Sequence, residues 1–142
     1  MPTRKSTAKW EGGLKNGKGT FAGQTGLGGQ YNFSSRFENG TGSNPEELLA
    51  AAEAACFSMA LSAGLEKEGF VPASVETEAA CTVEKVGEGF KVTRMQLTTT
   101  ARVPNIDNDK FQAIAAATKE GCPISAAIKG NVQLDLTATL AS

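Results

Sequence analysis

Alternating apolar residues mark three segments in the second half of the chain as strands. Residues 74–86 and 90–103 alternate on either side of a Gly-Glu-Gly turn, and the apolar phase of the second segment shifts between Val92 and Met95. Such a shift predicts a β-bulge, because one extra residue restores the inward face. A third segment alternates without interruption, at Val132, Leu134, Leu136, Ala138 and Leu140. We therefore expect three half-buried strands here.

The first part of the chain combines short apolar segments with turn residues. A Gly-Gly and an Asn-Gly dipeptide stand where hairpin turns would connect strands. Residues 30–37, QYNFSSRF, alternate so that Tyr31, Phe33 and Phe37 share one face and Arg36 lies on the other. We therefore expect strands and turns from the N-terminal region through Phe37.

A long alanine-rich segment carries the start and stop signals of a helix. Asn44 is a good N-cap, Pro45 suits the first helical position, and Glu47 stands at the third position of a capping box. We expect this helix to run to about Lys67, with Gly69 as its stop.

A second helix is expected from near Asp107 to Gly121, and a short third helix follows from Pro123. The resulting order of elements, βββ-α-ββ-αα-β, predicts an α+β fold. No internal repeat or linker divides the sequence, so we expect a single domain across residues 1–142.

The composition limits the kinds of partner and cellular location that we expect, and it leaves the predicted fold unchanged. The 14 basic and 15 acidic residues nearly cancel, which favours neither nucleic acid nor an anionic membrane as a partner. The longest uninterrupted apolar run falls far short of the ~18 residues that span a bilayer. The basic N-terminus leads into no apolar segment, so a secretory signal is not expected. We predict a cytoplasmic protein without a membrane segment.

The chain contains no histidine and only three cysteines. Without histidine, imidazole can neither activate a serine or cysteine nucleophile within this chain nor bind a metal. The cysteines are well separated and form no CxxC pair, which argues against a structural zinc site. We therefore predict no metal and no cofactor.

Two of the cysteines stand in unusual places. Cys56 lies in the middle of the alanine-rich helix, where small neighbours leave room for a partner element or a pocket. Cys122 stands in a Gly-Cys-Pro turn at the N-cap of a helix, where unpaired N–H groups stabilise a thiolate. Packing alone remains an alternative for both residues. Cys81, on the apolar-leaning face of a strand, is expected to be a core residue.

A reactive Cys56 needs a cation nearby, and Arg36 is the best candidate. An arginine in a mostly apolar pocket also needs an acid, which Glu46 or Glu47 can supply. Glu46 precedes Cys56 by ten residues, which is about 15 Å along one helix. Because no Gly or Pro between them breaks the helix, a site containing both must be shared by two chains. We therefore predict a two-fold homodimer with composite sites.

Two motifs resemble those of a known family. Residues 36–61, RFENGTGSNPEELLAAAEAACFSMAL, and residues 121–125, GCPIS, are similar to the two cysteine motifs of the osmotically inducible protein and organic hydroperoxide resistance (OsmC/Ohr) family. The Trp-Glu-Gly near the N-terminus and the order of elements agree, so the resemblance covers essentially the whole chain. The arginine directly before the helix resembles the OsmC branch.

The resemblance implies an OsmC-like fold, a β-sheet with a long central helix, in an intertwined homodimer. It also implies a thiol peroxidase, and the apolar, alanine-lined face around Cys56 favours organic peroxides over hydrogen peroxide as its substrates. Cys56 resembles the peroxidatic cysteine and Cys122 the resolving one; their disulfide is reduced by an external dithiol, typically a lipoylated protein in the family. Arg36 resembles the arginine that holds the thiolate and Glu46 the acid that positions this arginine, with Glu47 as a second candidate.

Glu53, one turn before Cys56, leaves two alternatives open. It is either exposed to solvent, or it faces the thiol and disfavours the thiolate. Two other functions also remain alternatives for the chain. One is a general disulfide reductase, against which the missing CxxC argues. The other is a non-enzymatic protein whose apolar pocket holds a lipid or another small molecule.

Overall fold

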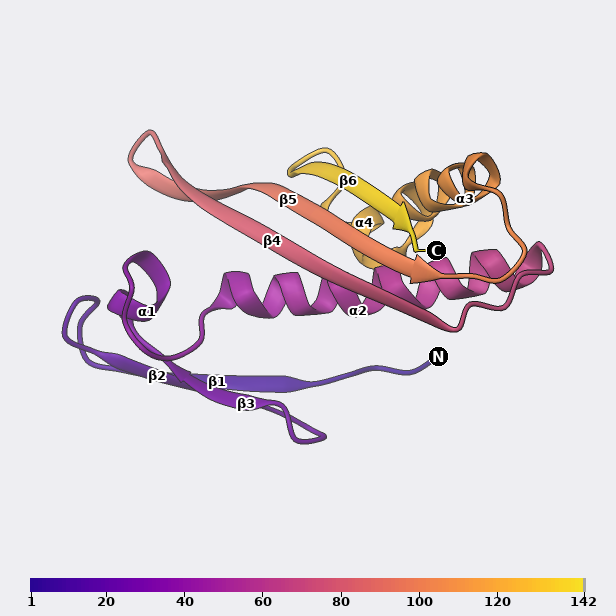
Figure 1. Ribbon diagram of the computed structural model, residues 1–142. Coiled ribbons are helices and arrows are strands. Elements are labelled where there is room, and N and C mark those ends of the chain that lie inside the picture. The colour runs from indigo at the N-terminus through magenta and orange to yellow at the C-terminus, as the bar shows by residue number, and fades with distance from the viewer. Residues whose placement is uncertain (142) are drawn as a thin grey trace. The chain divides into compact units, whose positions relative to one another are not determined.

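The computed structural model describes residues 1–141, which form two compact units. The first unit comprises residues 1–48, and the second begins at Leu49, inside a helix that crosses the boundary. In chain order the elements are β1 (Ser6–Glu11), β2 (Lys18–Gly23), β3 (Gly28–Tyr31), α1 (Phe33–Phe37), α2 (Pro45–Lys67), β4 (Ser74–Val86), β5 (Gly89–Arg102), α3 (Asn108–Gly121), α4 (Pro123–Ile128) and β6 (Gln133–Leu140) (Figure 1). This order confirms the predicted α+β class and adds one helix, α1.

The first unit is built on an antiparallel sheet in which β2 lies between β1 and β3. The turn from β1 to β2 spans residues 12–17 and contains both dipeptides that predicted a hairpin. Gly12 adopts a φ of 91° there, a left-handed conformation that glycine reaches without strain.

The chain turns into a helix directly after β3, so the prediction of strand structure through Phe37 was wrong. The side chain of Asn32 accepts a hydrogen bond from the Ser35 N–H at 2.8 Å, and the Ser35 hydroxyl accepts one from the Asn32 N–H at 2.9 Å. This reciprocal capping box starts α1 and overrides the aromatic alternation. Phe33 and Phe37 then lie four residues apart on one side of the helix, with ring centroids 5.2 Å apart.

The N-cap Asn44 and the stop at Gly69 are confirmed, but the predicted capping box is only half formed, because the Glu47 carboxylate bonds to Ser43 and not to the Asn44 N–H. The side chain of Asn44 accepts a hydrogen bond from the Glu47 N–H at 2.8 Å. The carboxylate of Glu47 accepts one from the Ser43 hydroxyl at 3.1 Å. After the last turn, Gly69 adopts a φ of 92°, as a helix stop requires. The helix therefore runs without a break through Cys56.

By length and composition, α2 is also long and apolar enough to cross a membrane, with a mean hydropathy of 1.6 over 18 residues. The apolar residues of α2 are interrupted by charged ones, so the helix contains no long uninterrupted apolar run. Core helices of soluble proteins meet the same criterion, and α2 packs Phe57, Leu61 and Leu65 into the core of the second unit. Only 28% of the apolar window is buried within this chain.

The sheet of the second unit has the strand order β4-β5-β6 (Figure 1). β4 and β5 are antiparallel, and their register passes from the pair Thr82–Arg94 to the pair Val83–Val92. One residue of β5 is therefore extra, which confirms the predicted bulge. β6 pairs with β5 in parallel, and α3 and α4 form the crossover that a parallel pair requires.

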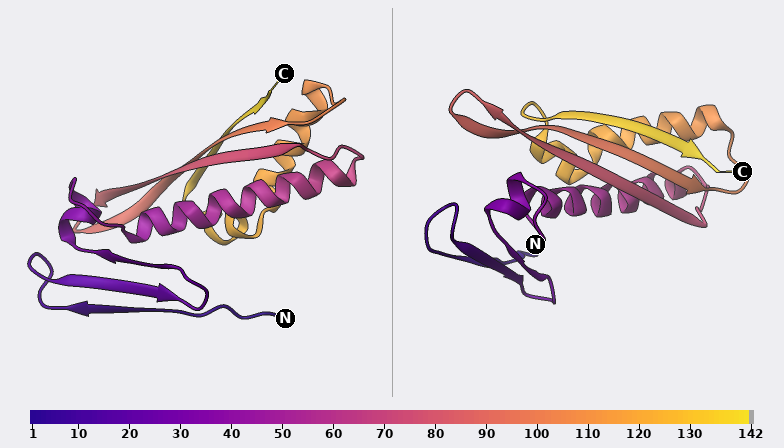
Figure 2. Two further views of the ribbon diagram at one scale, coloured as in Figure 1. Left: turned by 60° about the horizontal axis from the view of Figure 1, so that its bottom comes forward. Right: turned by 60° about the vertical axis from the view of Figure 1, so that its left-hand side comes forward.

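One face of this sheet carries the core. Alternate residues of β5 are buried, and α2, α3 and α4 lie along that side of the strands (Figure 2). The fully buried core side chains are Phe57, Leu61 and Leu65 of α2, Met95, Leu97 and Ala101 of β5, and Phe111 and Ala115 of α3. The turn between α3 and α4 contributes Cys122 to the same cluster.

Candidate active site

Cys56 and Cys122 lie in contact, although 66 residues separate them in the sequence. The thiol of Cys122 donates to that of Cys56 across a distance of 2.8 Å between the Sγ atoms, and neither residue forms a disulfide. A disulfide bond is ~2.05 Å long, so the two sulfurs need to approach by less than ~1 Å to form one. The fold therefore places two thiols where they can be oxidised to a disulfide with little movement.

The turn between α3 and α4 directs Cys122 inward, where its side chain is 1% exposed. The N–H of Cys122 donates to the Thr118 carbonyl, and its own carbonyl accepts from the Ala126 N–H, both at 2.9 Å. Its side chain makes no capping hydrogen bond with α4. This corrects the expectation that free N–H groups of α4 stabilise a Cys122 thiolate. The backbone N–H of Ile124, in the first turn of α4, instead lowers the pKa of the Cys56 thiol.

Burial raises the pKa of the Cys56 thiol above its ordinary value, and the contact with Cys122 raises it further. The N–H of Ile124 acts in the opposite direction but leaves the pKa raised. No cation is among the groups that shift this pKa. Since the thiolate is the nucleophile, Cys56 in these surroundings needs a positive charge to become reactive near neutral pH.

In the first unit, Arg36 and Glu46 form a close ion pair. Nε and Nη2 of Arg36 lie 3.1 and 2.9 Å from Oε1 of Glu46, so two N–H groups bind the carboxylate. The Glu46 side chain is 8% exposed, whereas that of Arg36 is 37% exposed. Glu47, the second candidate, bonds to Ser43 instead. The carboxylate therefore fixes the guanidinium and leaves part of it open to a ligand.

Arg36 borders an aromatic pocket of about 260 Å³ in the first unit. The pocket is lined by Trp10, Leu14, Tyr31, Asn32, Phe33, Arg36 and Phe37. The guanidinium lies 5.0 Å from the centroid of the Phe37 ring, which corrects the prediction that Arg36 points away from the aromatic side chains. The correction follows from α1, because residues 36 and 37 do not face opposite ways on a helix as they do on a strand. A pocket with one cation and an apolar wall suits a ligand with a polar head and a hydrocarbon body.

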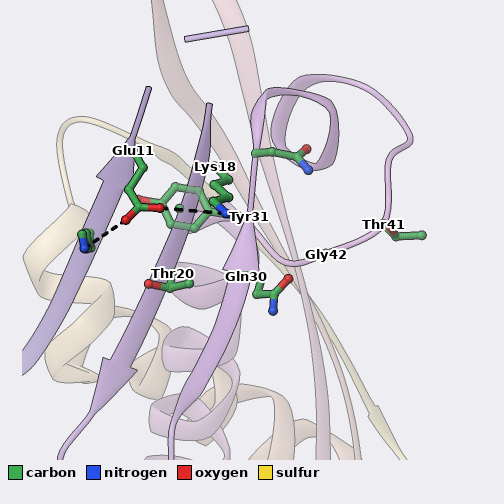
Figure 3. Close-up of a pocket in the computed structure, with 10 residues that line it drawn as sticks. Glu11, Lys18, Thr20, Gln30, Tyr31, Thr41 and Gly42 are labelled. Atoms are coloured by element: carbon green, nitrogen blue, oxygen red, sulfur yellow. Dashed lines mark ion pairs between the residues drawn. The ribbon is translucent and has the colours of Figure 1, made fainter. Parts of the chain in front are cut away.

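A larger cavity of about 540 Å³ lies over β1, β2 and β3 (Figure 3). Glu11 pairs there with Lys9 at 2.9 Å and with Lys18 at 4.0 Å, and all three side chains are at least half exposed. Its lining contains no cysteine and no arginine. We therefore assign it no part in thiol chemistry.

Glu53 is fully buried, which excludes the alternative that it is exposed to solvent. The alternative that remains is a carboxyl that faces the Cys56 thiol and disfavours its thiolate. Its Oε1 accepts a hydrogen bond from the Ser125 hydroxyl, and its Oε2 has no hydrogen-bond partner. Glu53 precedes Cys56 by three residues on α2, and Ser125 follows Cys122 by three residues on α4. The contact between Glu53 and Ser125 therefore lies one helical turn from the contact between Cys56 and Cys122, and both contacts join α2 to α4 or to the turn before it. The three-residue spacing was visible in the sequence, but the burial was not.

Cys81 packs against the core from β4, as its place on the apolar-leaning face of that strand predicted. Among residues 1–141, no group of three or more Cys, Asp or Glu side chains is arranged to hold a metal ion. The candidate site residues therefore fall into three groups: the thiol pair, the Arg36–Glu46 pair and Glu53.

The chain matches a known protein family, and the matched region contains both cysteines of the thiol pair. The OsmC-like protein family matches residues 38–137, a range that contains both Cys56 and Cys122. The chain therefore belongs to the OsmC-like protein family, as its two cysteine motifs indicated.

Relatives from both branches of the family are similar to this chain. Peroxiredoxin OsmC of Escherichia coli K12 is 46% identical over 134 residues, which cover 93% of this chain and 94% of that protein. Organic hydroperoxide resistance protein OhrB of Bacillus subtilis 168 is 33% identical over 100 residues, covering 70% and 71%. The crystal structure of OhrB superposes with a TM-score of 0.73 at 30% identity, over 96% of this chain and 98% of the other. The higher identity to OsmC agrees with the predicted branch.

Proposed function

We propose that this protein is a thiol-dependent peroxidase that reduces organic hydroperoxides through Cys56 and Cys122. The observation that carries the proposal is the 2.8 Å contact between the two sulfur atoms. The family supports the same activity, because similar members are named peroxiredoxin OsmC and organic hydroperoxide resistance protein.

The reaction begins when the Cys56 thiolate attacks an oxygen of the hydroperoxide. The O–O bond breaks, an alcohol leaves, and Cys56 becomes a sulfenic acid. The thiol of Cys122 then attacks the sulfenic sulfur, so that a disulfide forms and water is released. An external dithiol reduces the disulfide and restores both thiols. The family resemblance points to a lipoylated protein as this reductant.

Arg36 supplies the positive charge in this proposal. Its guanidinium stays protonated at any working pH and favours the thiolate of Cys56, against the burial that raises the pKa of this thiol. Glu46 holds the guanidinium through two N–H groups and so fixes its orientation. The same charge stabilises the oxygen anion that develops as the O–O bond breaks.

The site is composite in this proposal, with Arg36 and Glu46 of one chain beside Cys56 of a second. Glu46 and Cys56 lie on one unbroken helix, about 15 Å apart along its axis. The apolar window of α2 is 28% buried within one chain, and an apolar helix of this length needs further cover in water. A two-fold homodimer supplies both the missing cation and the missing cover. Sedimentation of the purified protein tests this: we expect a dimer, and a monomer that retains full activity would contradict the composite site.

The aromatic pocket beside Arg36 favours an organic substrate over hydrogen peroxide. Its wall offers apolar contact to a hydrocarbon group, and hydrogen peroxide has no such group to bury. We expect kcat/KM for cumene hydroperoxide to exceed that for hydrogen peroxide by about 100-fold, consistent with ~3 kcal/mol of apolar burial. Equal or reversed values would refute this preference.

We place this activity in the cytoplasm, where thiols stay reduced between turnovers. We also propose that the two compact units form a single domain, because α2 continues without a break from one into the other.

The test counts thiols and measures intact mass before and after one equivalent of cumene hydroperoxide. We expect the wild-type protein to lose two thiols and two mass units, and Cys122→Ser to stop at a trappable sulfenic acid. Cys81→Ser serves as the matched control and should behave as wild type. Unchanged thiols in the wild-type protein would contradict the proposed function.

A further inference from the structure

The carboxyl group of Glu53 has no part in the chemistry described so far, yet its position is unusual. It is completely buried, and from Leu49 to residue 141 no other aspartate, glutamate, lysine or arginine is buried. Ser125 binds one of its oxygens, and Oε2 is left without a hydrogen-bond partner. An ionised carboxylate with an unpaired oxygen is costly to bury, so its retention in the core calls for a reason.

The peroxidatic thiol lies one helical turn away. Glu53 and Cys56 are three residues apart on α2, and side chains on a helix lean toward its N-terminus, so Cys56 leans over the turn that holds Glu53. Their negative forms oppose each other, and the Glu53 carboxylate is one of the groups that raise the pKa of Cys56. A carboxyl group and a thiol this close together carry one negative charge between them at a lower cost in free energy than two negative charges.

The other titratable groups around this carboxyl are few. Cys122, in the turn before α4, contacts the neighbouring Cys56 thiol, and Cys81 is the titratable side chain among the core-packed residues of the sheet. A pocket of about 170 Å³ opens beyond Ser125, bordered by Lys119, Glu120 and Lys129. Lys129 pairs with Glu120 at 3.2 Å, and both are mostly exposed. Because the chain has no histidine, Glu53 is the one buried group here that ordinarily ionises below neutral pH.

We propose that Glu53 accepts the proton of the Cys56 thiol and donates it to the leaving alcohol, a role that rests on the peroxidase function proposed above. Ionised Glu53 takes the proton through Oε2, so Cys56 becomes the thiolate while the pair keeps one negative charge. The thiolate attacks the hydroperoxide, the S–O bond forms and the O–O bond breaks. The sulfur is oxidised to sulfenic acid, and the departing alkoxide takes the proton from Glu53. The carboxylate is then restored, and the Ser125 hydroxyl holds its Oε1 throughout.

Two electrophiles that the Cys56 thiolate attacks separate this role from a structural one. A hydroperoxide leaves an alkoxide that needs a proton, whereas iodoacetamide leaves iodide, which needs none. We would measure both rate constants for Cys56 in the Cys122→Ser background, at a pH where Cys56 is fully ionised, with and without Glu53→Gln. The matched control is Glu66→Gln, the same change at an exposed position of α2.

General acid–base groups typically contribute 10²–10⁴-fold, so we expect Glu53→Gln to slow the hydroperoxide reaction by about 100-fold and to leave alkylation within twofold. Glu66→Gln should change neither rate. Equal changes in the two rates, or no change, would overturn the proposal. If the unsubstituted protein reacts with iodoacetamide but not with cumene hydroperoxide, the proposed peroxidase function itself fails, which is a different result.

Discussion

Two glutamates on the same helix, seven residues apart, meet opposite surroundings. Glu46 is nearly buried and binds two N–H groups of Arg36. Glu53 is fully buried, binds one hydroxyl and keeps one oxygen without a hydrogen bond. The first carboxylate is matched by a cation and holds it in place. The second has no cation and is therefore suited to exchange a proton.

The same contrast separates the two regions that hold them. The Arg36 region has a fixed cation beside an aromatic pocket and no thiol in its lining. The Cys56 region has two thiols in contact, and no cation is among the groups that shift the pKa of Cys56. In the proposed mechanism neither region reduces peroxide by itself, because the cation is held at the start of α2 and the thiol lies in the middle of that helix. The proposal therefore requires a second chain to bring the two together.

The largest expected effect comes from the thiol that starts the reaction. Cys56→Ser should lower hydroperoxide consumption by at least ~10³-fold, because a serine hydroxyl is not ionised at neutral pH and cannot form a sulfenic acid. Steady-state consumption of cumene hydroperoxide with a dithiol reductant measures this. Residual activity above a few per cent would mean that another residue attacks the peroxide.

Removal of the cation should have the next largest effect. Arg36→Gln should lower kcat/KM by about 100-fold, the typical cost of losing one group that stabilises developing charge. It should also shift the pH profile upward: burial raises the pKa of the Cys56 thiol, and without the guanidinium nothing opposes that shift except the Ile124 N–H.

The rate of alkylation of Cys56 as a function of pH measures the shift. Arg94→Gln is the matched control, since Arg94 forms a comparable ion pair with Asp135 at 2.7 Å on the sheet. An unchanged pH profile in Arg36→Gln would remove Arg36 from the site.

The smallest effect distinguishes the two acids at the start of α2. Glu46→Gln keeps the shape of the side chain but loses the charge that fixes Arg36, so we expect about a tenfold loss in kcat/KM. Glu47→Gln should stay within about twofold, because Glu47 bonds to Ser43 and not to the arginine. The reverse order of effects would show that the acid that positions Arg36 has been misassigned.

Much of the fold was readable in the sequence because the signals were local. The N-cap Asn44, the stop at Gly69 and the phase shift beside Met95 each act within a few residues. The contact of Cys56 with Cys122 was expected only from the family resemblance, since it depends on how α2 and the turn before α4 pack together.

The errors arose where two local signals competed or where burial decided the outcome. The alternation of Tyr31, Phe33 and Phe37 predicted a strand, but the capping box at Asn32 and Ser35 made a helix. Spacing placed Glu53 near Cys56, but only the packing of α4 shows that this carboxyl is buried against Ser125. The pairing of Arg36 with Glu46 required side-chain geometry, because the sequence left Glu47 as a second candidate.

The most direct test of the divided chemistry is to place its two halves on different chains. Cys56→Ser and Arg36→Gln would be co-expressed with different affinity tags, and the heterodimer purified and assayed with cumene hydroperoxide. One of its two composite sites then has both Cys56 and Arg36 intact, so we expect about half of the wild-type rate although both parent homodimers are nearly inactive. A heterodimer no more active than its parents would contradict the composite site and place Arg36 and Cys56 of each working site on the same chain.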